Sequence, residues 1–116
     1  MRVYANRDAF RVILENLLDN ARKYGGGKVE LHSSTEAGRW KLEVRDFGLG
    51  FDPQLSERLF DPFSRAAKGS VIHGSGLGLS LSRQLARQMG GELSATSQGE
   101  GKGSTFTLSL NPVPNG

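Results

Sequence analysis

Apolar residues in the first part of the chain recur at a helical spacing. From position 7 to position 24 they return every three or four residues, which predicts an amphipathic helix. Asn6 is suited to cap its start, and the glycines that begin at Gly25 are suited to end it. The apolar positions that carry the pattern are Phe10, Ile13, Leu14, Leu17, Leu18 and Ala21.

A second helical pattern covers 76–89, where large apolar residues occupy every fourth position ahead of Gly90 and Gly91. A shorter helix is predicted over 54–60, because a proline stands at its start. The segment 61–75 has no periodicity, and we expect it to be a mobile loop. The apolar positions of the long pattern are Leu77, Leu81, Leu85 and Met89.

Apolar and polar residues alternate in four other stretches, which predicts strands. In the second stretch Trp40, Leu42 and Val44 share one face. The link between the first two stretches ends in Gly38, so these two strands are expected to form a hairpin. The stretches are 28–34, 39–46, 92–97 and 103–110, with 1–4 as a further short edge strand.

The order of these elements indicates the fold class. Because strands and helices do not alternate regularly, the sequence favours an α/β sandwich, with one mixed β-sheet and helices packed on one face. A chain of 116 residues fits one compact domain, which we place at 1–110. The tail 111–116 contains two prolines and is expected to be disordered.

Composition and charge exclude several classes of function. The chain has no cysteine, which excludes disulfides and thiolate metal sites. No apolar run approaches the about 20 residues that a membrane span needs, so this domain is not expected to be inserted in a membrane. The net charge is +3, but the basic residues are scattered, without the aromatic-bearing patch of nucleic-acid binders. A mild positive charge suits a small polyanion instead.

Two asparagines lie one turn apart on the first predicted helix. Asn16 and Asn20 share a face that borders the apolar stripe, although asparagine is a poor residue for helix interiors. An amide oxygen is a good ligand for Mg²⁺, which takes few protein ligands and keeps phosphate and water. Taken alone, the pair also fits a solvated polar edge of the helix.

The residues RDFGLGF, at 45–51, follow an apolar strand. Asp46 ends that strand, and a carboxylate there can accept a hydrogen bond from the exocyclic amine of adenine, whereas the carbonyl oxygen of guanine would be repelled. Gly48 and Gly50 would let the backbone approach a flat base. An ordinary Asx turn explains the same residues.

The residues GSGLGLS, at 74–80, place three alternating glycines before a predicted helix. Backbone N–H groups and the helix dipole at such a place favour phosphate. A glycine-rich hinge is the alternative. The spacing matches neither the G-x-G-x-x-G dinucleotide fingerprint nor a P-loop.

Taken in order, these motifs resemble the ATPase module shared by histidine kinases, type II topoisomerases, heat-shock chaperones and mismatch-repair proteins. NLLDNARKY resembles its asparagine box, DFGLG its first glycine box and GSGLGLS its second. LFDPFSR, at 59–65, lies between the glycine boxes and resembles the phenylalanine box of histidine kinases. The resemblance extends over nearly the whole chain and implies the Bergerat-type ATP-binding fold.

The resemblance also implies roles for single residues. Asn20 would bind Mg²⁺, Asn16 would approach the phosphates, and Asp46 would read the adenine amine. Lys23 would reach phosphate, and Tyr24 would pack on adenine. The remaining nucleotide contacts would come from Gly48, Gly50, Arg65, Gly74, Ser75, Gly76, Leu77 and Gly78, with Arg65 neutralising the γ-phosphate and residues 66–73 acting as a lid.

The implied function is phosphoryl donation from Mg-ATP to a histidine on a separate helical dimerisation domain, and from there to a response regulator. Neither His32 nor His73 lies in a predicted helix, so neither resembles the phosphoacceptor of the family. The domain is expected to be cytoplasmic, and the sequence leaves open whether its parent protein is anchored in a membrane.

Three alternatives share this fold or this ligand. An ATP-hydrolysing clamp carries a glutamate one turn before the metal-binding asparagine, but Asn16 stands there, and Glu15 points about 100° away on the helix. An anti-sigma serine kinase is disfavoured by the well-formed LFDPF sequence. A pure nucleotide-binding module remains the third alternative.

Overall fold

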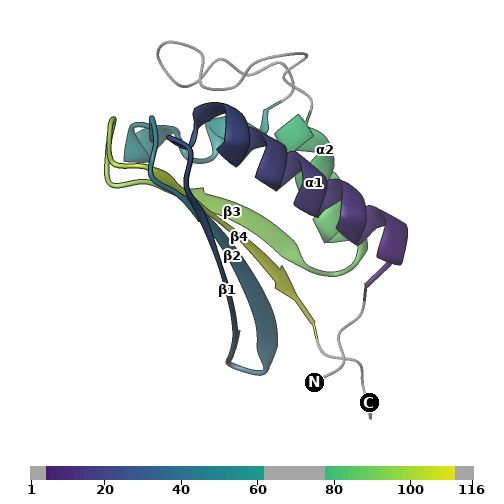
Figure 1. The fold of residues 1–116 in the computed structure, drawn as a ribbon. Coiled ribbons are helices and arrows are strands. Elements are labelled where there is room, and N and C mark those ends of the chain that lie inside the picture. The colour runs from purple at the N-terminus through teal and green to yellow at the C-terminus, as the bar shows by residue number, and fades with distance from the viewer. Residues whose placement is uncertain (1–4, 62–77, 112–116) are drawn as a thin grey trace.

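The computed structural model describes residues 5–61 and 78–111, and in these residues two helices lie on one face of a four-stranded sheet (Figure 1). The predictions for 1–4, for most of the loop 61–75 and for the tail beyond Asn111 fall outside the described residues. The elements in chain order are α1 (Arg7–Tyr24), β1 (Val29–Glu36), β2 (Arg39–Asp46), the 3₁₀ turns η1 (Pro53–Leu55) and η2 (Arg58–Phe60), α2 (Gly78–Gln88), β3 (Glu92–Thr96) and β4 (Ser104–Leu110).

The sheet has the strand order β1-β2-β4-β3, and every described pairing is antiparallel. The prediction of one sheet with helices on one face is confirmed, but the expected mixed pairing is not seen in these strands. The reason lies in the connections. β1 and β2 are joined by a two-residue turn in which Ala37 and Gly38 both have positive φ, the pattern of a tight hairpin. β3 and β4 are joined by a short glycine-rich loop, so both pairs are forced to run antiparallel.

Helix α1 has the predicted bounds, and the predicted residues cap its two ends. The Asn6 side chain accepts a hydrogen bond from the Ala9 N–H, which satisfies a donor that the first turn leaves free. At the other end the Gly25 N–H donates to the Ala21 carbonyl. Ile13, Leu17 and Ala21 form the buried side of the helix. The side chain of Asn16 therefore lies at the edge of this buried stripe, next to α2.

The core lies between the helices and the inner face of the sheet. Burial of these side chains removes apolar surface from water, which is the main favourable term in folding. The core residues are Ile13, Leu17, Ala21, Val44, Phe51, Leu59, Phe60, Leu79, Ala86, Met89, Leu93, Ala95, Phe106, Leu108 and Leu110.

Helix α2 ends as predicted, but its buried face coincides only in part with the predicted apolar stripe. Gly90 adopts a positive φ, and the Gly91 N–H donates to the Ala86 carbonyl, which closes the helix. Leu81 is 44% exposed, whereas Ser82 and Ala86 are fully buried. Residues four apart advance about 40° around a helix with 3.6 residues per turn. A stripe with a strict spacing of four therefore drifts off the buried face.

The prediction of a helix over 54–60 is wrong. The chain forms two separate 3₁₀ turns, η1 and η2, in its place. Asp52 caps the first turn by accepting from the Gln54 N–H. Leu59 and Phe60 are both buried. Both belong to η2, which packs against α2.

Candidate functional site

Two adjoining cavities lie beside the C-terminal half of α1. The first, of about 10 Å³, lies over the end of β2 and is lined by Asn20, Tyr24, Asp46, Leu49, Gly50, Phe51, Leu59, Ser104 and Phe106. The second, of about 80 Å³, lies between α1 and the start of α2 and is lined by Asn16, Asp19, Asn20, Lys23, Tyr24, Gly78 and Leu79. Asn20 and Tyr24 line both cavities, which therefore adjoin and are described together as one candidate site.

The structure thus brings together seven of the residues singled out in the sequence. Gly48 lies close by but lines neither cavity. The other predicted site residues, Arg65, Gly74, Ser75, Gly76 and Leu77, lie outside the described residues, as do His73 and the predicted lid.

Asp46 is a buried carboxylate, with 4% of its surface exposed. Its Oδ1 accepts hydrogen bonds from the Gly48 N–H at 3.1 Å and the Ser104 N–H at 3.2 Å. Its Oδ2 accepts from the Ser104 hydroxyl at 2.7 Å. A carboxylate offers about four acceptor sites, so these three bonds fix its orientation and leave about one site for a ligand.

The two glycines after Asp46 lie against other backbone segments of the chain. A Cβ at Gly48 would collide with the Tyr24 carbonyl oxygen and lie 2.6 Å from the Gly25 backbone. Gly50 has a positive φ, and a Cβ there would lie 2.8 Å from the Gly103 carbonyl oxygen. The sequence predicted that these glycines admit a base, whereas in the structure they let backbone segments pack on one another.

Those backbone segments are joined by hydrogen bonds. The Leu49 N–H donates to the Tyr24 carbonyl at 3.1 Å, and the Gly103 N–H donates to the Gly48 carbonyl at 3.1 Å. The Ser97 hydroxyl accepts from the Phe51 N–H and donates to the Gly103 carbonyl. The loop after β2 is therefore held between the end of α1 and the β3–β4 loop.

Asn16 connects the two helices. Its Nδ2 donates to the Ser82 hydroxyl oxygen at 2.9 Å and to the Gly78 carbonyl oxygen at 3.2 Å. A Cβ at Gly78 would lie 3.8 Å from the Asn16 side chain, which is ordinary van der Waals contact. Gly78, in contrast to Gly48, is therefore not required to be glycine by the packing of the described residues.

Charged side chains lie at the second cavity, between α1 and the start of α2. Lys23 and Arg22 both pair with Asp19, the former at 3.1 Å. The hydrogen bond from Arg22, and next that from Lys23, lowers the pKa of Asp19 below its ordinary value. These side chains are 43% exposed or more, so Lys23 can leave Asp19 for another anion at little cost.

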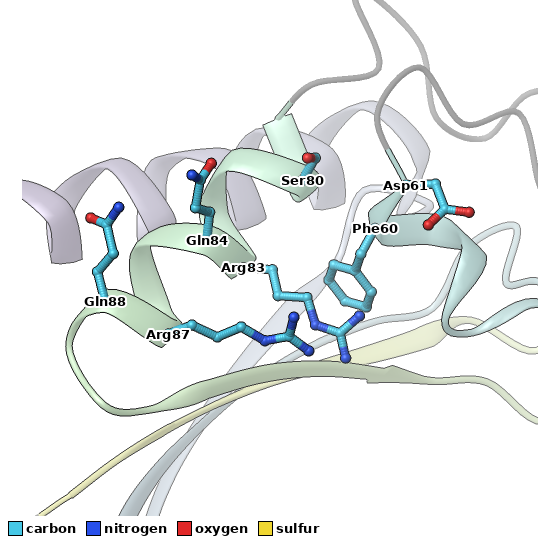
Figure 2. A pocket seen from close by; sticks show the side chains of 7 residues that line it. All are labelled: Phe60, Asp61, Ser80, Arg83, Gln84, Arg87 and Gln88. Atoms are coloured by element: carbon cyan, nitrogen blue, oxygen red, sulfur yellow. The ribbon is translucent and has the colours of Figure 1, made fainter.

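The opposite side of α2 carries an ionic cluster around a groove of about 530 Å³ (Figure 2). The Arg83 guanidinium lies over the Phe60 ring, 4.3 Å from its centroid, and pairs with Glu57 at 2.9 Å and with Glu92 at 3.2 Å. Burial raises the pKa of Glu92, but hydrogen bonds from Arg87, the Leu93 N–H and Arg83 outweigh it and lower the pKa. These bonds tie η2, α2 and β3 together, and none of the predicted site residues lines the groove.

Sequence reasoning missed Ser104 and the apolar wall of the first cavity. Ser104 begins β4, directly after Gly103, and nothing near it in the sequence points to Asp46. The antiparallel register of β2 and β4 pairs the two residues. The available signal for Ser104 was its type and place: it is a polar residue at the first position of a strand that follows a glycine turn. The apolar wall consists of Leu49, Phe51, Leu59 and Phe106.

Comparison with known proteins identifies relatives over nearly the whole chain. Residues 5–114 match the family described as histidine kinase-, DNA gyrase B- and HSP90-like ATPases. The sensor protein TorS of Escherichia coli (strain K12) is 44% identical over 101 residues, which are 86% of this chain and 11% of TorS. The sensor histidine kinase YkoH of Bacillus subtilis (strain 168) is 37% identical over 116 residues, covering 98% of this chain and 25% of YkoH.

Solved structures agree with the sequence relatives. A crystal structure of full-length ShkA in complex with AMPPNP superposes with a TM-score of 0.80 at 30% identity, covering 96% of this chain and 23% of that chain. The chain therefore spans a small part of the length of these relatives. Among the residues that the structure describes, no helix has the length and apolar character to cross a membrane.

The fold prediction is confirmed by this agreement, as is the resemblance drawn from the four sequence motifs. The structural neighbours include a catalytic domain of the histidine kinase ThkA, and the sequence relatives named above are a sensor protein and a sensor histidine kinase. Because the family match covers residues 5–114, this chain belongs to the histidine kinase-, DNA gyrase B- and HSP90-like ATPases and is an ATP-binding domain.

Proposed function

We propose that this chain binds Mg-ATP and donates the γ-phosphoryl group to a histidine on a separate helical dimerisation domain of a two-component sensor kinase. A response regulator would then receive the phosphoryl group from that histidine. The observation that carries the proposal is the pair of adjoining cavities, with the buried Asp46 carboxylate at one end and Asn16, Asn20 and Gly78 at the other. The names of the sequence relatives, and the AMPPNP bound by ShkA, support it.

Asp46 is the group that selects the base. Three of its acceptor positions are used by the chain, and Asp46 lines the first cavity, so we propose that the remaining position is available to a ligand there. An exocyclic amine can donate to it there. The carbonyl oxygen that guanine presents would leave a buried acceptor opposite a buried acceptor, which is costly. The site therefore favours ATP over GTP.

The phosphate end fits a metal that arrives with the nucleotide. No group of three or more acidic or histidine residues that could hold a metal exists among the described residues. Asn20 supplies a neutral amide oxygen, and Mg²⁺ accepts one or two protein oxygens when phosphates and water complete its shell. When bound, Mg²⁺ neutralises phosphate charge. Lys23 would add a positive charge at the same end once it leaves Asp19.

Phosphoryl transfer to a partner is favoured over hydrolysis. Asn16 cannot act as a base, because an amide does not take up a proton near neutral pH, and its NH₂ group is bonded to α2. Glu15 is exposed on another side of the helix. We therefore propose that water bound in this site is not activated. Arg65 would neutralise the γ-phosphate during transfer, as the family resemblance implies.

The site must widen to admit a nucleotide. The two cavities, of about 10 and 80 Å³, are smaller than the about 300 Å³ at which ligand pockets begin. The walls of the first are fixed by hydrogen bonds on the β2 and β4 side.

A transfer assay tests the proposal. With γ-labelled ATP and Mg²⁺, the chain alone should acquire no stable label and release little phosphate, whereas a supplied helical dimerisation domain should become labelled. Arg65→Ala should reduce that labelling. Arg11→Ala removes the same charge from an exposed position of α1 and serves as the control. Stable label on the chain alone, or rapid phosphate release without a partner, would contradict the proposal.

A further inference from the structure

Ser82 is a fully buried polar residue in the middle of α2. Together with Asp46 it makes up the buried polar and charged side chains of the described residues. Burial of a hydroxyl is costly unless it is hydrogen-bonded, and the partner of Ser82 is Asn16, at 2.9 Å. Ser82 itself lines neither cavity of the nucleotide site. Any effect it has on a ligand must therefore pass through another residue.

The two partners of Asn16 determine which way its amide points. The Gly78 carbonyl can accept but cannot donate. The Asn16 group within 3.2 Å of it is therefore the NH₂ rather than the oxygen. The second N–H goes to Ser82, so both amide hydrogens are used. Only the Asn16 oxygen remains for the cavity that Asn16 and Asn20 line.

We propose that Ser82 is a positioning residue of the nucleotide site, whose buried hydroxyl, together with the Gly78 carbonyl, holds the Asn16 amide with its oxygen toward the metal side. This inference rests on the proposed function. Asn16 then acts as an acceptor, for the cation or for water bound to it, and not as a donor to a phosphate oxygen. Helices α1 and α2 lie side by side (Figure 1), and the bond fixes Asn16 relative to the first turn of α2.

A matched pair of variants separates the effect of the Ser82 hydroxyl from the effect of side-chain volume. Ser82→Thr and Ser82→Val add nearly the same volume at a buried position, but only the first keeps a hydroxyl. Mg-ATP affinity, followed by calorimetry as Mg²⁺ is titrated, should be about three- to tenfold weaker in Ser82→Val than in Ser82→Thr, which is the usual effect of losing one neutral hydrogen bond. Metal-free ADP affinity should be equal in the two variants. Equal magnesium dependence would overturn the proposal.

A double-variant test shows whether Ser82 acts through Asn16. In an Asn16→Ala background, the difference between Ser82→Val and Ser82→Thr should disappear. A difference that persists unchanged would mean that Ser82 acts on packing alone, and would overturn the proposed role.

A measurement on the unaltered chain avoids any question of folding. The side-chain NH₂ protons of Asn16, assigned by NMR, should exchange with solvent much more slowly than those of exposed Asn6, which caps α1. Equal exchange would contradict the proposal even if both Ser82 variants fail to fold. If the unaltered chain does not bind Mg-ATP, the proposed function fails and this inference with it. If the chain binds and the two variants behave alike, the inference alone fails.

Discussion

The two ends of the candidate site are built in opposite ways. At the Asp46 end the carboxylate is buried and bonded to Gly48 and Ser104, and the adjoining backbone segments leave no room for a Cβ at Gly48. At the Asn20 end the side chains stand on the surface of α1, the ion pairs are exposed, and Gly78 has space around it.

The difference shows which part of recognition the fold prepares in advance. A buried group with fixed partners loses little entropy when a ligand arrives, which suits a site that distinguishes one base from another. Surface side chains can rearrange around a flexible polyphosphate and a hydrated metal. We therefore expect changes at the Asp46 end to destabilise the fold and weaken binding together, and changes at the Asn20 end to change binding without destabilising the fold.

The largest effect is expected at Gly48. The added methyl of Gly48→Ala would press on the backbone at Tyr24 and Gly25. Strain of this kind should lower the free energy of unfolding by about 3 kcal/mol, and the midpoint of thermal unfolding by more than about 10 °C. Circular dichroism measures both. A midpoint within a few degrees of the parent would show that the Asp46 end is not as tightly packed as the structure indicates.

Asp46→Asn should change both stability and selectivity. Its NH₂ group would face donors from Gly48 or Ser104, because an amide cannot accept every bond that the carboxylate accepts. The loss of the charged acceptor should weaken ATP binding by about 1.5–3 kcal/mol. Preference for ATP over GTP should fall with it. Calorimetric titration with both nucleotides tests this, and equal affinity of the unaltered chain for ATP and GTP would contradict the assignment of Asp46 to the base.

Gly78→Ala is the matched control for Gly48→Ala, since the same methyl is added at the other end of the site. It meets only ordinary contact with Asn16, and helix propensity should raise the free energy of unfolding by up to about 1 kcal/mol. ATP affinity should fall about tenfold, because overpacking by one methyl where phosphate approaches the backbone costs about 1–3 kcal/mol. A strong loss of stability, or unchanged affinity, would remove the contrast between the two glycines.

The smallest effect is expected from Asp19→Asn. The folded-state pKa of Asp19 is lowered by Arg22 and then by Lys23, so its contribution to stability is present above its ordinary pKa of 3.8 and is lost as pH falls through the lowered value. Because Asp19 is exposed, thermal unfolding should hardly change at neutral pH. Affinity for ATP should rise slightly at low salt, since Lys23 is released, and the gain should shrink as salt screens the charges. A gain that is independent of salt would argue against this electrostatic explanation.

The sequence by itself determined the family and most of the local elements, the helix predicted over 54–60 excepted. The bounds of α1, the β1–β2 hairpin and the glycine cap of α2 follow from short-range signals: a capping asparagine, a turn glycine and a helical spacing of apolar residues. The asparagine box and the first glycine box are also short stretches that can be read from the sequence. The structure brings their key side chains, Asn16, Asn20 and Asp46, to one site.

The tertiary structure alone decided what each of these residues touches. Sequence spacing could not show that Leu31 would be 52% exposed. This exposure follows from the position of β1 at the edge of the described sheet. It could not show that Ser104 would bind Asp46, since the pairing of β2 with β4 joins residues 58 positions apart. It could not show that Asn16 would bond to Ser82, across 66 positions. Such contacts depend on how whole elements pack, whereas caps, turns and periodicity depend on neighbours in the chain.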